Sequence, residues 1–404
     1  MKILYVTVED MNLSKGSAVH VREIVRRLRE MDCEVTLVAS GSPQQAEAGG
    51  SGRSGKRRHC GGRIRRMTRI LWGLIRVFLH ANRGLLSHDL VYARDYHVAL
   101  ACTLARTIFR KPLIYEINGI PSEEWLMKGD TILRRVMARV IRELERLAAR
   151  HADSIVTVTH GLRAYLVSRF GVEPMKISVI PNGVDTMVFH PMHDTGSRER
   201  LRTRIGIQKD NPLVLFVGNL APWQGVSTLL DSIPLVRSQV PRARFVIVGE
   251  GALRPDLERQ TRRMNLEKHV SFTGMISHDQ VPHYIHIADV CVSPFVTRRN
   301  NRIGLSPLKI YEYMACGKAV VSSRIAGLDF IEETGSGILV DPEDPEDLAR
   351  GIAMVLLNPE RRAAMGRNGA RVALQECDWR KRAREILEIA TDQTQRLSPS
   401  RVFP

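Results

Sequence analysis

A short stretch around residue 306 combines residue types that can bind an anion. Ser306 can cap the start of a helix through its hydroxyl, Pro307 suits the first helical position, and Gly317 fits a left-handed stop. The sequence therefore predicts a helix over 307–315. Such a helix points backbone N–H groups and a positive dipole toward whatever precedes it, so an anion is the expected ligand.

Three glycines directly follow predicted strands in the same half of the chain. They are Gly218, Gly249 and Gly274. A glycine lets a ligand approach the backbone closely, although it can also simply end a strand. Ligands of parallel sheets bind beyond the carboxyl ends of the strands. Together with the capped helix, these loops favour a nucleotide-binding cleft.

The elements that must position these residues alternate between strands and helices along the chain. Strands are predicted in the first half at 2–8, 34–39, 89–93, 112–117, 154–158 and 176–180. In the second half they are predicted at 213–217, 244–248, 270–273, 290–293, 319–322 and 338–340. Strand, helix, strand units favour right-handed parallel sheets. A chain of 404 residues exceeds one ordinary core.

We therefore expect an α/β protein with two doubly wound, Rossmann-like domains facing a cleft. The predicted domains are 1–190, with a basic insertion at about 41–88, and 191–360. A helical tail over 361–404, with Trp379 in it, is expected to cross back to the first domain.

The motif Ser-Pro-Leu-Lys-x-x-Glu-Tyr-Met-Ala-x-Gly-Lys, which begins at Ser306, resembles a known family. It is similar to the donor-binding segment of retaining glycosyltransferases with the GT-B fold, family 4 and its relatives (glycosyl transferases group 1), in a Ser-Pro-Leu-Lys subgroup. Pro181-Asn182-Gly183 is a turn sequence by itself, but the longer string from Ile180 to Asp185, with Phe189 and Pro191 following, resembles the domain junction of that family. The resemblance implies transfer of a sugar from a nucleoside-diphosphate sugar to an acceptor hydroxyl, in glycan, glycolipid or natural-product glycoside synthesis. It implies no cofactor beyond this co-substrate, and an acceptor that is a glycan, a lipid-linked group or a small molecule.

The resemblance also implies roles for individual residues. Glu312 matches an acid that bonds the donor ribose hydroxyls, while from its spacing alone it could simply form an ion pair on the helix surface. Met275 and Ile276 match the position that covers the nucleotide base. Gly16 and Ser17 match a loop that meets the donor phosphates or the acceptor.

Asn118 follows the predicted strand 112–117, at the edge where such sheets bind ligands. Members of the family usually carry a His-bearing turn there, so the Asn-Gly version resembles a subgroup variant. Glu123 and Glu124 follow, either as first-turn helix acids or as groups that bind or deprotonate the acceptor.

The sequence departs from the family pattern at three positions. Gly304 stands where most members carry an acid, and Asn219 and Gln224 stand where they carry Arg and Lys. A diphosphate leaving group needs positive charge. Lys309 is the first candidate to supply it, followed by Arg298, Arg299 and Arg302 in the loop expected before the helix, although these four basic residues could also be a solvated face.

The candidate catalytic residues are therefore Lys309, Asn118 and Glu312. The candidate donor-binding residues are Gly16, Ser17, Gly218, Asn219, Gln224, Gly249, Met275, Ile276, Arg302, Ser306, Pro307, Leu308 and Glu312. The sequence shows no metal-ligand cluster or Asp-x-Asp motif, so we expect metal-independent transfer. A non-catalytic protein that binds a nucleotide sugar or a partner enzyme is the alternative, motivated by the three departures.

Positive charge dominates the composition, with 60 Lys and Arg against 43 Asp and Glu and a net charge of +17. An anionic partner or surface is expected. Much of the charge lies in the basic insertion, whose apolar stripe around Trp72 is either a crossover helix on the sheet or an amphipathic helix on an anionic membrane. Nucleic acid is less favoured because few stacking aromatics accompany the charge.

The start of the chain reads as a strand without a cleavable signal, and the sequence has no run of about 18 uncharged apolar residues. We therefore expect a cytoplasmic protein, with peripheral attachment to the inner face of the membrane as the further possibility.

Overall fold

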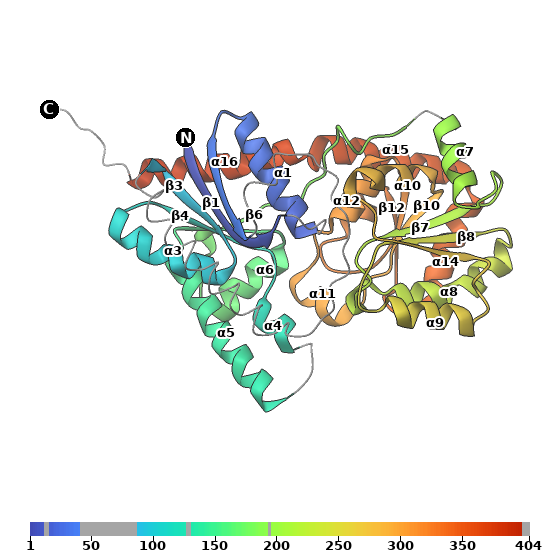
Figure 1. The fold of residues 1–404 in the computed structure, drawn as a ribbon, viewed down its shortest axis with the longest axis horizontal. Helices are drawn as coiled ribbons and strands as arrows, with labels where there is room; N and C mark the ends of the chain where they lie inside the picture. The colour runs from blue at the N-terminus through green and yellow to red at the C-terminus, as the bar shows by residue number, and fades with distance from the viewer. Residues whose placement is uncertain (12–15, 41–86, 127–130, 193–194, 398–404) are drawn as a thin grey trace, which may run out of the picture. The chain divides into compact units, whose positions relative to one another are not determined.

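The computed structural model describes residues 1–11, 16–40, 87–126, 131–192 and 195–397 (Figure 1). The chain divides into two units, Met1–Ile180 with Arg382–Pro404, and Pro181–Lys381. The sequence places the first boundary at 190, but the segment from Pro181 belongs to the second unit. The reason is a backbone contact, because Val184 N donates a 2.8 Å hydrogen bond to Cys377 O.

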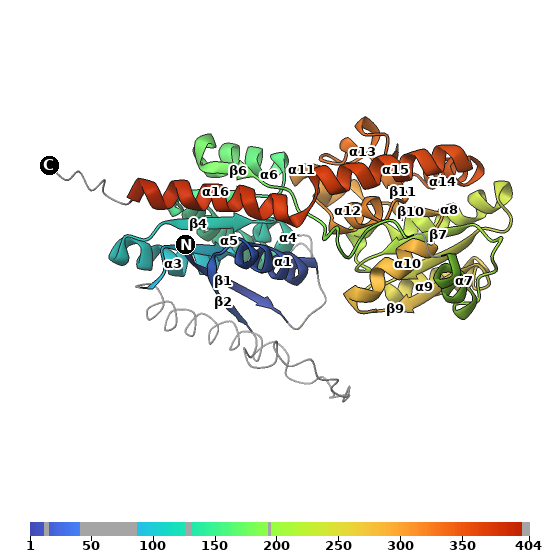
Figure 2. The ribbon, with the colours of Figure 1, turned by 90° about the horizontal axis from the view of Figure 1, so that it is seen from above.

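The first unit is built on a six-stranded sheet whose paired strands are all parallel. In sheet order its strands are β2 (Glu34–Ser40), β1 (Lys2–Asp10), β3 (Leu90–Arg94), β4 (Leu113–Ile117), β5 (Ser154–Thr157) and β6 (Ile177–Val179). Its helices include α1 (Gly16–Glu30), α3 (Tyr96–Phe109), α4 (Pro121–Leu126), α5 (Ile132–His151) and α6 (His160–Tyr165). Figure 2 shows these helices around the sheet.

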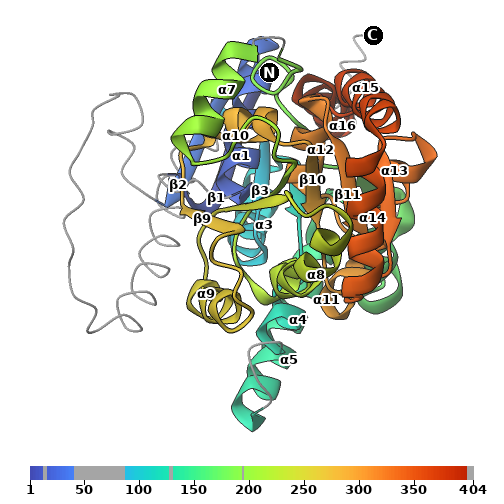
Figure 3. The same cartoon turned by 90° about the vertical axis from the view of Figure 1, so that its right-hand side faces the viewer.

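The second unit repeats the arrangement with another six-stranded parallel sheet (Figure 3). In sheet order its strands are β12 (Gly337–Val340), β11 (Ala319–Ser323), β10 (Val290–Ser293), β7 (Leu213–Val217), β8 (Arg244–Val248) and β9 (Val270–Gly274). Its helices are α7 (Thr195–Arg204), α8 (Val226–Gln239), α9 (Arg254–Arg263), α10 (Val281–Ile287), α11 (Thr297–Ile303), α12 (Leu308–Ala315), α13 (Phe330–Glu333), α14 (Pro345–Leu357) and α15 (Pro359–Glu376).

Alternation along the central strand β7 explains how both faces of the second sheet are covered. Leu213 and Leu215 pack in one apolar cluster with residues of α10 and α12. Val214 and Phe216 pack in another with residues of α8 and α14. Successive side chains of a strand point to opposite faces, so a continuous apolar run indicates a strand buried on both sides. The predicted class, α/β with two parallel, Rossmann-like sheets, is confirmed.

Three local predictions need correction. The tail predicted over 361–404 is not one helix, because α15 ends at Glu376 and α16 (Trp379–Leu397) begins after a break. At the break, Trp379 N donates to Val184 O (3.2 Å), so the backbone pairs with the junction segment instead of continuing the helix. The stretch before Ser306, expected as a loop, contains α11. The capped helix begins at Leu308.

Two expectations concern membranes, one about the basic insertion and one about helices that could cross a bilayer. The stripe around Trp72 and nearly all of the basic insertion lie outside the described residues. Among the helices that are described, none is both long enough and apolar enough to cross a bilayer.

Candidate active site

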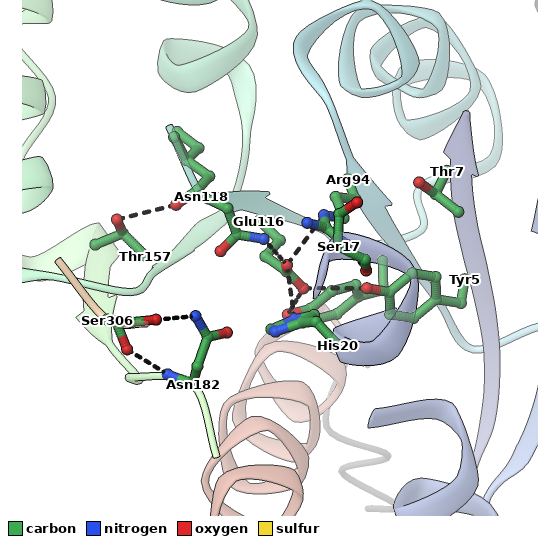
Figure 4. Close-up of polar contacts among 12 residues, drawn as sticks. Tyr5, Thr7, Ser17, His20, Arg94, Glu116, Asn118, Thr157, Asn182 and Ser306 are labelled. Carbon is green, nitrogen blue, oxygen red and sulfur yellow. Dashed lines mark hydrogen bonds and ion pairs between the residues drawn. The ribbon is translucent and has the colours of Figure 1, made fainter. Parts of the chain in front are cut away.

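The start of α12 differs from the predicted cap. Pro307 occupies the N-cap position and makes no side-chain cap. The Ser306 hydroxyl instead accepts a hydrogen bond from Asn182 N (2.8 Å), and Asn182 Nδ2 donates to Ser306 O (2.5 Å), as Figure 4 shows. Ser306 is therefore engaged by the junction segment, which explains why it does not cap the helix.

The end of α12 agrees with the sequence. Gly317 has φ of 69° and follows the C-cap residue Cys316. Gly317 N donates to Met314 O (2.9 Å) and Lys318 N donates to Tyr313 O (3.0 Å). This pair of bonds is the Schellman stop, which needs a residue that tolerates a left-handed conformation. The predicted left-handed stop at Gly317 is confirmed.

Lys309 lies in the first turn of α12 but is buried at the carboxyl edge of the sheet. Its Nζ donates a 2.6 Å hydrogen bond to Gln224 Oε1 and lies 4.0 Å from the ring centroid of Phe216. Burial lowers the pKa of Lys309 to about 7, although the carboxylate of Glu312 acts in the opposite direction. A cation held at this edge, over an aromatic face and beside one amide oxygen, can bind an incoming anion strongly.

At two of the strand-end glycines, the space around the Cα atom also explains why the residue is glycine. A Cβ on Gly218 would lie 2.5 Å from Lys309 Nζ, so a larger residue there would displace the ammonium group from its position. A Cβ on Gly249, whose φ is 133°, would lie 1.9 Å from Gly218 O. The strand ends of β7 and β8 therefore approach each other closely. Their loops are also joined, because Leu220 N donates to Glu250 O (2.9 Å).

Glu312 lies one turn further along α12, is only 7% exposed, and contacts a histidine. Its Oε1 is 3.1 Å from His278 Nε2. His278 follows β9 by four residues and lies in the loop that carries Met275 and Ile276. The structure thus connects the helix to the loop expected to cover the base, and His278 becomes a candidate site residue that the sequence reasoning missed.

The remaining candidates occupy several places on their own units. Met275 is exposed, whereas Ile276 is partly buried against the core of the second unit. Arg302 is exposed near the end of α11. In the first unit, Gly16 begins α1.

Comparisons with known proteins identify both halves of the chain. The family described as "Glycosyltransferase Family 4" matches residues 14–188, and "Glycosyl transferases group 1" matches residues 197–372. The fold is similar to that of the sucrose-phosphate synthase of Thermosynechococcus elongatus, with a TM-score of 0.79, 20% identity, and 98% of this chain and 99% of that chain covered. This chain is a GT-B glycosyltransferase.

Curated relatives of this glycosyltransferase include two groups of named enzymes. The GDP-mannose-dependent alpha-(1-6)-phosphatidylinositol monomannoside mannosyltransferase of Mycolicibacterium smegmatis is 32% identical over 256 residues, which are 63% of this chain and 66% of that protein. The D-inositol 3-phosphate glycosyltransferase of Xylanimonas cellulosilytica is 28% identical over 333 residues, 80% of this chain and 76% of that protein.

The first unit of this glycosyltransferase holds a buried polar network around Glu116, the residue two before Asn118 (Figure 4). Glu116 Oε1 lies 2.9 Å from His20 Nε2, and its Oε2 accepts hydrogen bonds from Tyr5 (3.1 Å) and Tyr92 (2.8 Å). Burial would raise the pKa of Glu116, but His20 beside it holds that pKa well below its usual range. The network is therefore built around a charged carboxylate.

Asn118 is held by this network through its amide nitrogen, which donates to Glu116. A carboxylate can only accept, so the amide oxygen must point the other way. Among the described residues, Asn118 Oδ1 is buried and has no hydrogen-bond partner. The geometry leaves that oxygen able to accept a hydrogen bond from a ligand. No sequence pattern links Glu116 to Tyr5 and His20, which come from distant segments.

Within the described ranges, no group of three or more His, Cys, Asp or Glu side chains is arranged to hold a metal ion. Metal independence therefore stays a prediction.

Proposed function

We propose that this glycosyltransferase transfers a sugar from a nucleoside-diphosphate sugar to an acceptor hydroxyl with retention of the anomeric configuration and without a metal ion. The observation that carries the proposal is the position of Lys309 Nζ, 2.6 Å from Gln224 Oε1 at the carboxyl edge of the second sheet. Gln224 stands where the resembling family carries a cation. The ammonium group of Lys309, on α12, therefore lies beside the position at which this chain lacks the cation of the family.

The donor would lie along this edge. Its diphosphate would approach Lys309 and the strand-end glycines Gly218 and Gly249, where the backbone is accessible to a ligand. The ribose hydroxyls would bond to Glu312, whose carboxylate His278 orients through the 3.1 Å contact. Met275 and Ile276 would cover the base.

In the transfer step, the bond between the sugar C1 and the diphosphate oxygen breaks, and the acceptor oxygen bonds to C1 on the same face. The acceptor proton passes to the departing phosphate oxygen. Negative charge grows on the diphosphate as this bond breaks, so a buried ammonium group would stabilise the transition state more than the ground state. Asn118 is the first-unit residue proposed to meet the acceptor, through its unpartnered amide oxygen.

The acceptor is proposed to be a glycan, a lipid-linked group or a small molecule. The names of the relatives favour an inositol phosphate or a phosphatidylinositol-type lipid, and GDP-mannose is one donor to test first. We further propose that the protein acts in the cytoplasm, at the inner face of the membrane when the acceptor is a lipid.

Transfer assays with a panel of UDP, GDP and ADP sugars test this proposal. Glu312→Ala should reduce kcat/KM about 10- to 100-fold, the effect of losing hydrogen bonds to a charged group. Glu267→Ala is the matched control, because Glu267 is an exposed acid that precedes β9 at the opposite edge of the same sheet. Unchanged transfer in Glu312→Ala would remove this residue from the donor site.

A non-catalytic protein that binds nucleotide sugars is the second candidate, favoured by Gly304, Asn219 and Gln224. Calorimetric binding of a nucleotide sugar, with neither hydrolysis nor transfer to any acceptor tested, would support this candidate against the enzyme.

A further inference from the structure

Helix α5 in the first unit carries an apolar stripe that its own unit leaves exposed. Ile132 is 82% exposed and Leu133 is 71% exposed. The stripe consists of the exposed residues Ile132, Leu133, Val136, Met137, Val140, Leu144 and Leu147. Their spacing of three and four residues places them along one side of the helix, over roughly 20 Å at 1.5 Å per residue. Monomeric soluble proteins rarely leave so long an apolar face uncovered, so it marks an interaction surface.

The opposite side of α5 explains why the stripe faces outward. Ala138, Glu145 and Ala148 are buried against the unit. Glu145 accepts hydrogen bonds from Ser122 N (3.1 Å) and Ser122 Oγ (2.6 Å), which hold α5 to α4. The helix therefore cannot rotate to bury the stripe without breaking this contact. One end of α5 also extends past the other elements of its unit in Figures 1 and 3.

Arginines border the stripe. Arg135 and Arg139 are exposed on the turns beside it, and Arg146 lies further along the same border. Glu143, an exposed acid on the same helix, is paired with Arg146 at 3.7 Å. The whole chain adds a net charge of +17. An apolar face bordered by arginines is complementary to a bilayer surface, where anionic headgroups meet acyl chains.

We propose that α5 is a membrane-binding helix that lies in the plane of an anionic phospholipid surface, with its stripe among the acyl chains and its arginines on the phosphates. This surface differs from the stripe around Trp72. The inference does not depend on the proposed donor chemistry.

Sedimentation with vesicles of phosphatidylcholine alone, or mixed with phosphatidylglycerol, tests the proposal on the full chain. Leu133→Gln combined with Val140→Gln should weaken binding to the anionic vesicles at least tenfold, because two apolar side chains lose their burial. Ile108→Gln combined with Met175→Gln is the matched control, since both residues are exposed and apolar in the same unit but lie outside α5. The control should bind as the wild type does.

A second variant, Arg139→Gln, tests the contribution of the arginine charges and should weaken binding to anionic vesicles roughly fivefold at low salt. Arg110→Gln, at another exposed arginine of the same unit, is its control. Glu312→Ala should bind vesicles normally while its transfer activity falls. The α5 variants should bind the nucleotide sugar normally, so each proposal can fail alone.

Normal vesicle binding by the α5 double variant overturns the inference. So does equal wild-type binding to neutral and anionic vesicles. If the double variant instead converts a dimer to a monomer with vesicle binding unchanged, the stripe is an interface between copies and the inference is also overturned.

Discussion

At the residue scale, Lys309 shows how a charge can be placed where the fold does not favour it. The side chain is 9% exposed, and burial lowers its pKa to about 7. Its ammonium group contacts one amide oxygen, on Gln224, and lies over the Phe216 ring, with the Phe295 ring 5.4 Å away. Such a group costs stability while charged, and costs of this kind concentrate at functional sites.

The pH dependence of donor binding should report on Lys309. Below pH 7 the ammonium is already charged and can meet a diphosphate directly. Above pH 7 the amine must first take up a proton, so affinity for a nucleotide sugar should fall as pH rises from 7 toward 9, by up to tenfold per pH unit. Isothermal titration calorimetry in buffers of different ionisation heat would detect this proton uptake. A flat affinity over that range would contradict the assignment.

Replacing Lys309 by methionine should separate stability from activity. Lys309→Met keeps an apolar chain of similar length, so it should raise the free energy of unfolding by about 1 to 2 kcal/mol at pH 7. The same change should lower transfer sharply, since no ammonium remains near the diphosphate. Urea unfolding and kcat/KM would be measured on the same preparations, with exposed Lys268→Met as control. Loss of stability together with loss of transfer would indicate a purely structural lysine.

At the element scale, the contact between α4 and α5 depends on a buried carboxyl group. Glu145 accepts both hydrogen bonds from Ser122, and burial raises its pKa to about 7. The folded pKa lies above the unfolded value of about 4.5. The stabilising contribution is therefore complete below the unfolded pKa and is lost as pH rises through about 7.

Glu145→Gln should remove this pH dependence. The amide keeps an acceptor for Ser122 but cannot ionise, so the variant should gain up to about 2 to 3 kcal/mol relative to the wild type between pH 5 and pH 8. Glu143→Gln, an exposed position on the same helix, should leave the wild-type profile unchanged. Urea unfolding at both pH values measures the difference, and parallel profiles for Glu145→Gln and the wild type would contradict the prediction.

At the scale of the whole molecule, each unit has its own parallel sheet, and the proposed donor residues on strand-end loops and on α12 belong to the second unit. A ligand that binds there should protect that unit first. Backbone hydrogen bonds such as Gly218 N to Val248 O and Gly249 N to Gly274 O lie at its edge.

Hydrogen exchange with and without a nucleotide sugar should therefore show its largest protection at 218–225, 249–251, 274–278 and 304–312. Protection there reflects the free energy of binding, which opposes local opening. Glu312→Ala at the same ligand concentration serves as the control and should show reduced protection in these segments. Protection confined to Met1–Ile180 would contradict the placement of the donor.

Much of the fold could be predicted because its signals are local. Strands such as 213–217, 244–248 and 290–293 have the predicted bounds, since apolar runs that end at glycine or a turn leave few alternatives. The prediction failed where a distant segment competes for the same atoms. Asn182 takes the Ser306 hydroxyl away from the helix cap, and Val184 interrupts the predicted tail helix by pairing with Trp379.

The sequence by itself determined the α/β class, the short helix with its glycine stop, and the motif that includes Lys309 and Glu312, because each depends on residues close together in the chain. Only the tertiary structure decided that Lys309 reaches Gln224 across 85 positions, and that His278 contacts Glu312 across 34. The same is true of the carboxylate network at Glu116 and of the exposed face of α5. Contacts between distant segments, and the burial that shifts a pKa, arise only when the sheets assemble. The periodicity of residues along the chain therefore does not predict them.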